Sequence, residues 1–77
     1  MTVEVSIERN SDGRLHAYVL ERGEDRNGDE TIRKGADLLK SRFVSSTETA
    51  RQECEGKLRD LFKFAPPTIT YIYPDGQ

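Results

Sequence analysis

The sequence predicts a small α+β domain in which one main helix packs on one face of an antiparallel sheet, in the order β-β-β-α-β. Three observations predict it: alternating apolar residues at the N-terminus, a capped amphipathic stretch after residue 45, and a β-branched, aromatic segment near the C-terminus. The chain has 77 residues, of which 34% are hydrophobic. It therefore has room for one domain, residues 1–77, and is too short for an α/β barrel or a two-domain dehydrogenase.

The first two strands are predicted as a hairpin. Residues 2–9 alternate, with Val3, Val5 and Ile7 on one face. Residues 10–13, Asn-Ser-Asp-Gly, are typical of a tight turn. The second arm, residues 14–22, places two sets of side chains on opposite faces, namely Leu15, Ala17 and Val19 against His16, Tyr18 and Leu20. Because neither face is wholly polar, the second side of the sheet is expected to be partly covered.

The middle of the chain is harder to interpret. Residues 23–30 contain no apolar side chain, so we expect an exposed, mobile acidic loop there. Residues 31–44 fit either a helical stripe or a strand, and Gly35 argues against an uninterrupted helix. A strand over residues 38–44 is favoured, because it would run directly into the strongest helix start in the sequence.

That helix start is Ser45 followed by Glu48, the spacing of a capping box. We expect a helix over residues 46–64, ended by two consecutive prolines. One stripe of this helix is apolar and consists of Ala50, Cys54, Leu58, Leu61 and Phe62. Gly56 interrupts the helix at a cost of about 1 kcal/mol, which suggests that another backbone comes close to it.

The C-terminal segment, residues 68–73, is rich in β-branched and aromatic residues and predicts a last strand, closed by residues 74–76, Pro-Asp-Gly. Since it is so apolar, we expect it to be paired inside the sheet and not left at an edge.

Composition narrows the class of protein. Lys and Arg number 12 against 14 Asp and Glu, which gives a formal charge of -2, so the chain lacks the positive excess of a polycationic nucleic-acid binder. A single cysteine excludes an intramolecular disulfide and a Cys-rich zinc site. The alternating N-terminus does not resemble a secretory signal, and no apolar run approaches the roughly 20 residues of a membrane helix. We therefore expect a cytoplasmic protein with no membrane contact.

Residues that could carry chemistry are few. His16 is the single histidine and has no second histidine or cysteine with which to share a metal, while Cys54 falls on the apolar stripe of the helix. A calcium loop starting at Asp25 fails, because its sixth position is Glu30 and its twelfth is Ala36. We therefore expect no catalytic residues, no metal and no cofactor, and a protein that is not an enzyme.

Two sets of residues are candidates for binding. The local positive excess consists of Arg33, Lys34, Lys40 and Arg42, and on a strand Lys40 and Arg42 would share a face. These residues either contact phosphates or form a solvated strand edge protected by lysine.

The second set is aromatic. Tyr18, Tyr71 and Tyr73, with Ile72 and Leu20, would form a patch on the sheet face that the helix leaves open, and His16 is a further contact candidate on the strand face of Tyr18. The alternative is that Tyr71 and Tyr73 belong to the core face of the last strand, and the register decides between the two. Glu24 and Asp25, in the expected acidic loop, would complete the patch.

From these features we expect a non-enzymatic protein-interaction module, such as a small inhibitor or adaptor that binds a larger protein complex through its open sheet face and acidic loop. Its partner would be another protein, either a different chain or a second copy. The alternative is a nucleic-acid-associated regulatory protein that uses Arg33, Lys34, Lys40 and Arg42, and a third hypothesis is an enzyme whose site is completed by a second subunit. The layout is common among small bacterial and phage proteins, and fold analogy alone does not choose among these functions.

Overall fold

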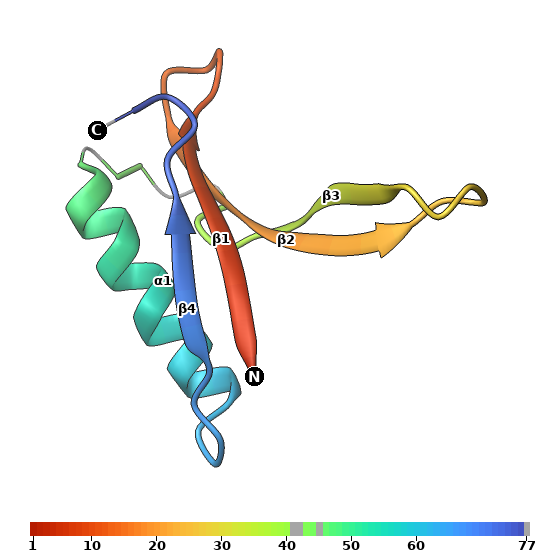
Figure 1. Cartoon of the computed structure of the whole chain (residues 1–77). Coiled ribbons are helices and arrows are strands. Elements are labelled where there is room, and N and C mark those ends of the chain that lie inside the picture. The colour runs from red at the N-terminus through yellow and green to blue at the C-terminus, as the bar shows by residue number, and fades with distance from the viewer. Residues whose placement is uncertain (41–42, 45, 77) are drawn as a thin grey trace.

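The computed structural model describes residues 1–40, 43–44 and 46–76 (Figure 1). Four strands and one helix follow one another in the predicted order β-β-β-α-β. Their bounds are β1 (Thr2–Arg9), β2 (Leu15–Glu24), β3 (Glu30–Asp37), α1 (Thr47–Leu61) and β4 (Thr68–Ile72).

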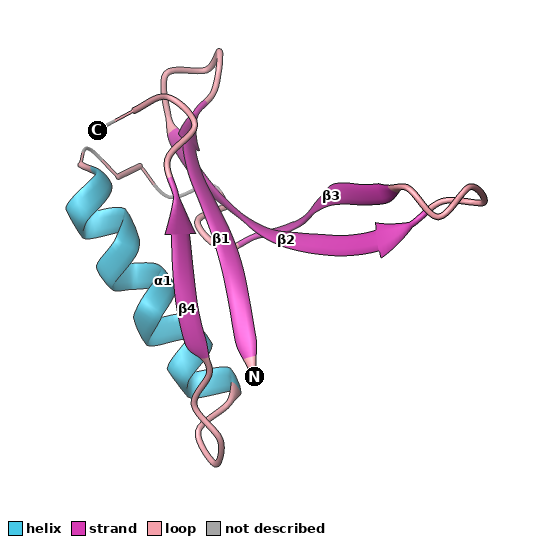
Figure 2. Ribbon diagram, in the orientation of Figure 1, coloured by secondary structure: helices cyan, strands magenta, loops and turns pink. Residues whose placement is uncertain are grey.

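The strands form one sheet in the order β3-β2-β1-β4. β2 pairs antiparallel with both β1 and β3, whereas β4 pairs parallel with β1. The predicted α+β class and element order are confirmed, but the sheet is mixed and not wholly antiparallel. The reason is that α1 carries the chain back along the sheet before β4 begins, so that β4 runs in the direction of β1 (Figure 2).

The core lies between α1 and one face of the β1–β2–β4 part of the sheet. Alternation along β1 and β2 supplies its sheet side, and the helical stripe supplies its other side. The buried residues are Val5, Ile7, Leu15, Ala17, Leu39, Val44, Ala50, Cys54 and Leu58. The predicted stripe is confirmed except at its end, where Leu61 is 70% exposed and Phe62 is only partly buried.

The start of α1 differs from the capping box expected at Ser45, a residue that lies outside the described part of the chain. Ser46 is the N-cap, and its side chain accepts a hydrogen bond from the Thr49 backbone amide at 3.2 Å. The helix ends at Leu61, before residue 64, where the Phe62 backbone amide donates to the Leu58 carbonyl. The expectation of a backbone close to Gly56 is wrong, because a Cβ built there meets nothing within 4 Å.

β2 and β3 continue beyond the body as a two-stranded hairpin, here called the arm, residues 20–34 (Figure 1). Residues 21–34 are exposed throughout, and Ile32 is 54% exposed. The register shifts between Tyr18 and Leu20, as at a β-bulge, and there the ribbon turns away from the body. Gly35 lies beside this shift. A residue with a side chain is disfavoured at this position, because a Cβ would lie 3.1 Å from the Val19 carbonyl oxygen.

The arm corrects two expectations. The third strand covers residues 30–37, and residues 38–40, which were expected to be strand, lie outside it, since Leu38 and Leu39 turn inward to the core after the strand has ended. Residues 23–30 are not a long loop, because β2 extends to Glu24 and β3 begins at Glu30. Only residues 25–29 lie outside these two strands.

β4 lies at an edge of the sheet, so the expectation of an interior strand is wrong. Its pairing with β1 runs from Thr2 opposite Thr68 to Ser6 opposite Ile72. Among the described residues β1 is its one strand neighbour, so the backbone groups of β4 that point away from β1 have no ladder partner.

Candidate functional site

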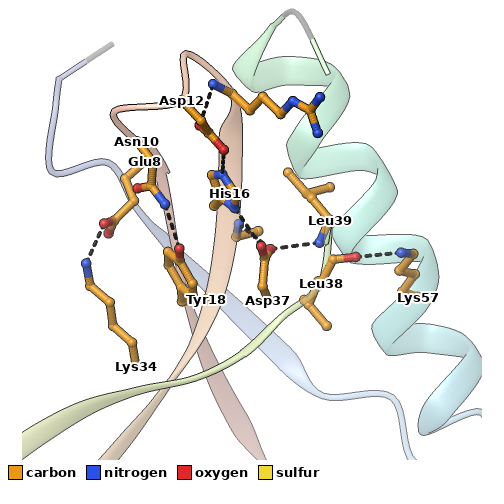
Figure 3. Close-up of polar contacts among 12 residues, drawn as sticks. Glu8, Asn10, Asp12, His16, Tyr18, Lys34, Asp37, Leu38, Leu39 and Lys57 are labelled. Atoms are coloured by element: carbon orange, nitrogen blue, oxygen red, sulfur yellow. Dashed lines mark hydrogen bonds and ion pairs between the residues drawn. The ribbon is translucent and has the colours of Figure 1, made fainter. Parts of the chain in front are cut away.

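The open face is the surface of the sheet opposite α1. In β1 and β2 the residues that alternate with the core are paired across the strands, Ser6 with Tyr18 and Glu8 with His16. Ser6 is only 3% exposed although it lies on the side away from the helix, and its hydroxyl donates to Glu8 Oε2 at 2.9 Å. The open face therefore carries an ordered polar cluster (Figure 3).

His16 is held between two carboxylates. Its Nδ1 lies 2.6 Å from Asp37 Oδ2, and its Nε2 lies 3.0 Å from Asp12 Oδ2. Asp12 belongs to the β1–β2 turn and Asp37 to the end of β3, so the imidazole joins three parts of the sheet. Asp37 Oδ1 in turn accepts from the backbone amides of Ala17 and Leu39, at 3.1 and 3.0 Å.

The two carboxylates favour the charged imidazolium. The hydrogen bond with Asp37 is the largest effect and raises the pKa of His16, with Asp12 adding to it and burial opposing it. Burial raises the pKa of the Asp37 carboxyl, but hydrogen bonds from His16 and from backbone amides outweigh that effect, and the net pKa is lowered. The pKa of Asp12 is also lowered, first by the Arg14 backbone amide and then by His16. The two carboxylates thus favour the protonated form of His16, which links the β1–β2 turn to the end of β3.

This arrangement does not suit His16 for proton transfer to a substrate. Both ring nitrogens already have carboxylate partners, so neither is directed at a free position on the surface. Among the described residues, no group of three or more His, Cys, Asp or Glu is placed to hold a metal ion. The thiol of Cys54 is buried, and burial raises its pKa to about 11.

Tyr18 is fixed beside His16 on the open face. The two rings stack with centroids 5.9 Å apart and planes 7° from parallel. Asn10 Nδ2 donates to the Tyr18 hydroxyl oxygen at 2.7 Å, and Lys34 Nζ lies 5.2 Å from the ring centroid. Lys34 also pairs with Glu8. These contacts hold a half-buried aromatic side chain in one orientation at the base of the arm.

The structure does not bring the predicted tyrosines together. Tyr71 and Tyr73 are partly buried against the core, and the Tyr71 hydroxyl lies 3.4 Å from the Arg51 carbonyl oxygen of α1. Burial raises the pKa of Tyr71. Of the two alternatives, the core-face interpretation fits these residues, because the parallel register with β1 places Tyr71 beside Val5. Of the predicted aromatic contact residues, His16 and Tyr18 remain on the open face.

The tip of the arm is an ordered acidic turn. Asp25 Oδ1 accepts from the backbone amides of Asn27 and Asp29, at 2.9 and 3.0 Å, and Gly28 has a φ of 82°. The Asp25 carboxylate therefore shapes the turn, while Glu24 is exposed at the end of β2. The tip carries the acidic residues Glu24, Asp25, Asp29 and Glu30 against one basic residue, Arg26.

Ion pairs connect the arm to the body and its strands to each other. The Arg22 guanidinium contacts Glu4 of β1 at 2.5 Å and Glu30 of β3 at 2.6 Å. Arg33 pairs with Glu21 across the ribbon. The arm is thus supported by backbone ladder bonds and charge pairs and not by core packing.

The predicted basic set is not assembled into one patch. Arg33 and Lys34 are each paired with a glutamate, and as neighbours in β3 they project from opposite faces. Lys40 lies in a turn with a φ of 46°, and it lines an open cleft of about 420 Å³ together with Lys57 and Leu61. The expected strand that would have aligned Lys40 with Arg42 is absent at Lys40, and Arg42 lies outside the described residues.

The sequence analysis singled out His16 and Tyr18 but not Asp12 and Asp37, the two residues whose carboxylates contact the His16 imidazole. Asp12 stands four positions before His16, a spacing that carries no special signal in a strand. Asp37 is brought close only by the antiparallel register, in which it pairs with Tyr18.

Comparison of the chain with protein-family models, with curated proteins and with solved structures finds no match. Within the ranges that the structure describes, no helix is long and apolar enough to cross a membrane.

Proposed function

We propose that the protein is a non-enzymatic protein-interaction module, a small inhibitor or adaptor, that binds a larger protein through the arm and the adjoining open face. The observation that carries this proposal is the arm itself. It takes up residues 20–34 of a 77-residue chain, yet residues 21–34 are exposed and contribute nothing to the core. A chain with so small a core gains little stability from such an element, so binding is the use that accounts for it.

The arm is prepared for binding before a partner arrives. Arg22 fixes its base to β1, and Asp25 fixes the turn at its tip. An element that is already ordered loses less conformational entropy on binding than a flexible loop does. The expectation of an acidic binding segment is therefore kept, with an ordered hairpin in place of a mobile loop.

The charge and the apolar side chains of the arm indicate what kind of surface the partner presents. The acidic tip favours a basic groove on the partner protein, where charge attraction speeds association. Tyr18 at the base of the arm and the exposed Ile32 midway along it offer apolar area with few rotamers to freeze, as contact residues at the centre of an interface do. We place this interaction in the cytoplasm, where a lone buried thiol stays reduced.

A capture experiment with tagged protein in native lysate, with and without nuclease, tests the proposal. The variant Glu24→Lys/Asp29→Lys reverses the charge of the tip but keeps the Asp25 carboxylate that shapes the turn. The variant Tyr18→Ala removes the aromatic contact. The matched control is Asp60→Lys/Glu48→Lys, which reverses two exposed charges on α1. We expect one discrete protein to be retained after nuclease treatment and lost with either site variant but kept by the control.

The captured protein is then purified and titrated with the same variants, so that direct binding is measured. Capture that disappears with nuclease would instead support the alternative, a nucleic-acid-associated regulator using Lys40 and its basic neighbours. Robust turnover of a substrate by the purified chain would contradict the non-enzymatic proposal altogether.

A further inference from the structure

The two edges of the sheet differ in how they are protected. β3 forms one edge, and it carries Arg33 and Lys34 and adjoins the irregular register at the base of the arm. β4 forms the other edge, and its sequence, Thr-Ile-Thr-Tyr-Ile, contains no charge, proline or glycine. Charged side chains and bulges are the usual means by which proteins prevent edge strands from pairing. The edge at β4 has none of them.

We propose that β4 pairs antiparallel with β4 of a second copy of this chain, about a two-fold axis at Thr70, so that the two sheets become continuous. This pairing does not depend on the proposed function, since the arm lies at the opposite edge. A two-fold axis is the commonest symmetry of small oligomers, and it requires a surface that complements itself.

The sequence of β4 complements itself in this register. On the face that packs under α1, Ile69 of one copy lies opposite Tyr71 of the other. On the open face, Thr68 lies opposite Ile72, and Thr70 lies opposite its own copy. Each pair joins β-branched or aromatic side chains, the cross-strand pairs that stabilise sheets, and no pair sets like charges together.

The charges of α1 do not oppose this pairing. Arg51 pairs with Glu48 and Glu55 of its own helix, and Glu55 also pairs with Arg59. These acidic and basic side chains balance one another, so the helices of the two copies bring no excess of like charge toward the axis.

Pairing also removes the unprotected edge from both molecules. The joined sheet ends at β3 on each side, where charged residues and the bent arm discourage further addition. The assembly therefore closes at two copies and presents its two arms at opposite ends.

Sedimentation velocity from about 1 µM to about 1 mM tests the proposal, because pairing of one short strand gives a small interface of the weak class, which forms only at high protein concentration. In Thr68→Lys/Thr70→Lys, the two-fold register creates one direct and two diagonal lysine contacts. These together weaken the dimer on the order of tenfold, as does Thr68→Glu/Thr70→Glu. An equimolar mixture of the two variants should associate again, because lysines then meet glutamates.

Matched controls separate this pairing from general charge effects and from misfolding. Thr31→Lys/Ala36→Lys adds the same charge to exposed positions of β3 and should leave the dimer unchanged. Circular dichroism establishes that each variant is folded. In the wild type, amide exchange over residues 68–72 should slow as concentration rises. A wild type that is monomeric at about 1 mM, or a dimer that the β4 lysine variant leaves intact, would overturn the proposal.

Discussion

Replacing Gly56 by alanine should stabilise the protein. Gly56 lies in the interior of α1 on its exposed side, and a Cβ there has nothing within 4 Å. Glycine in a helix interior costs about 1 kcal/mol relative to alanine, so the free energy of unfolding should rise by about that amount. For a domain of this size this corresponds to an increase in Tm of roughly 4–8 °C.

The matched control is the same substitution at Gly35. A Cβ there would come within 2.8 Å of Glu21 Oε1 and 3.1 Å of the Val19 carbonyl oxygen. The glutamate can move aside and give up its pairing with Arg33, but the carbonyl belongs to the β2 backbone. Gly35→Ala should therefore lower the free energy of unfolding by about 1 kcal/mol.

Thermal and urea unfolding, followed by circular dichroism, give both values. The reasoning requires opposite signs for the two alanine variants. If Gly56→Ala left the free energy of unfolding unchanged or lowered it, the helix surface at Gly56 would not be open, and the argument from its surroundings would be refuted.

Three further outcomes follow from the site and the core. His16 has a raised pKa, so its contribution to stability is complete below about 6.5 and declines as pH rises through the folded value, whereas the lowered pKa of Asp37 makes stability decline in acid. Urea unfolding against pH measures both, and in His16→Gln the decline on the alkaline side should disappear. Ser46→Ala removes the N-cap and should lower the free energy of unfolding by about 1 kcal/mol in the same assay. The Cys54 thiol, buried and with a pKa raised to about 11, should react with a thiol reagent at pH 8 only as fast as the protein opens, which stopped-flow labelling with and without urea checks.

The elements that face the core could be predicted from the sequence. Apolar periodicity predicts which side chains face the core, as in the alternation of Val3, Val5 and Ile7 and in the helical stripe through Ala50 and Cys54. The sequence of β3 shows no apolar periodicity, because this strand lies largely in the arm and does not pack against the core. Its ladder bonds and charge pairs with β2 cannot be read from apolar periodicity, and the polar sequence around it therefore suggested a loop.

The direction of a strand and its neighbours in the sheet could not be predicted from the sequence either. The composition of residues 68–72 predicts a strand but not whether it runs parallel to β1 or lies at an edge. The same applies to the site: His16 and Tyr18 share a face because they are two apart in a strand, whereas Asp37 joins them only through the register of β3. The position of Tyr71 under α1 could not be predicted for the same reason, since it is set by the register of β4 with β1.

The independence of the arm from the core has a practical consequence for engineering. Residues 21–34 can be lengthened, shortened or exchanged as a ribbon without altering a buried side chain, provided that the turn and the Arg22 contact with Glu4 are kept. Each added residue pair moves the tip outward by about 3.3 Å. The packed part of the domain thus serves as a scaffold, and the length and tip charge of the hairpin can be changed by one cross-strand residue pair at a time.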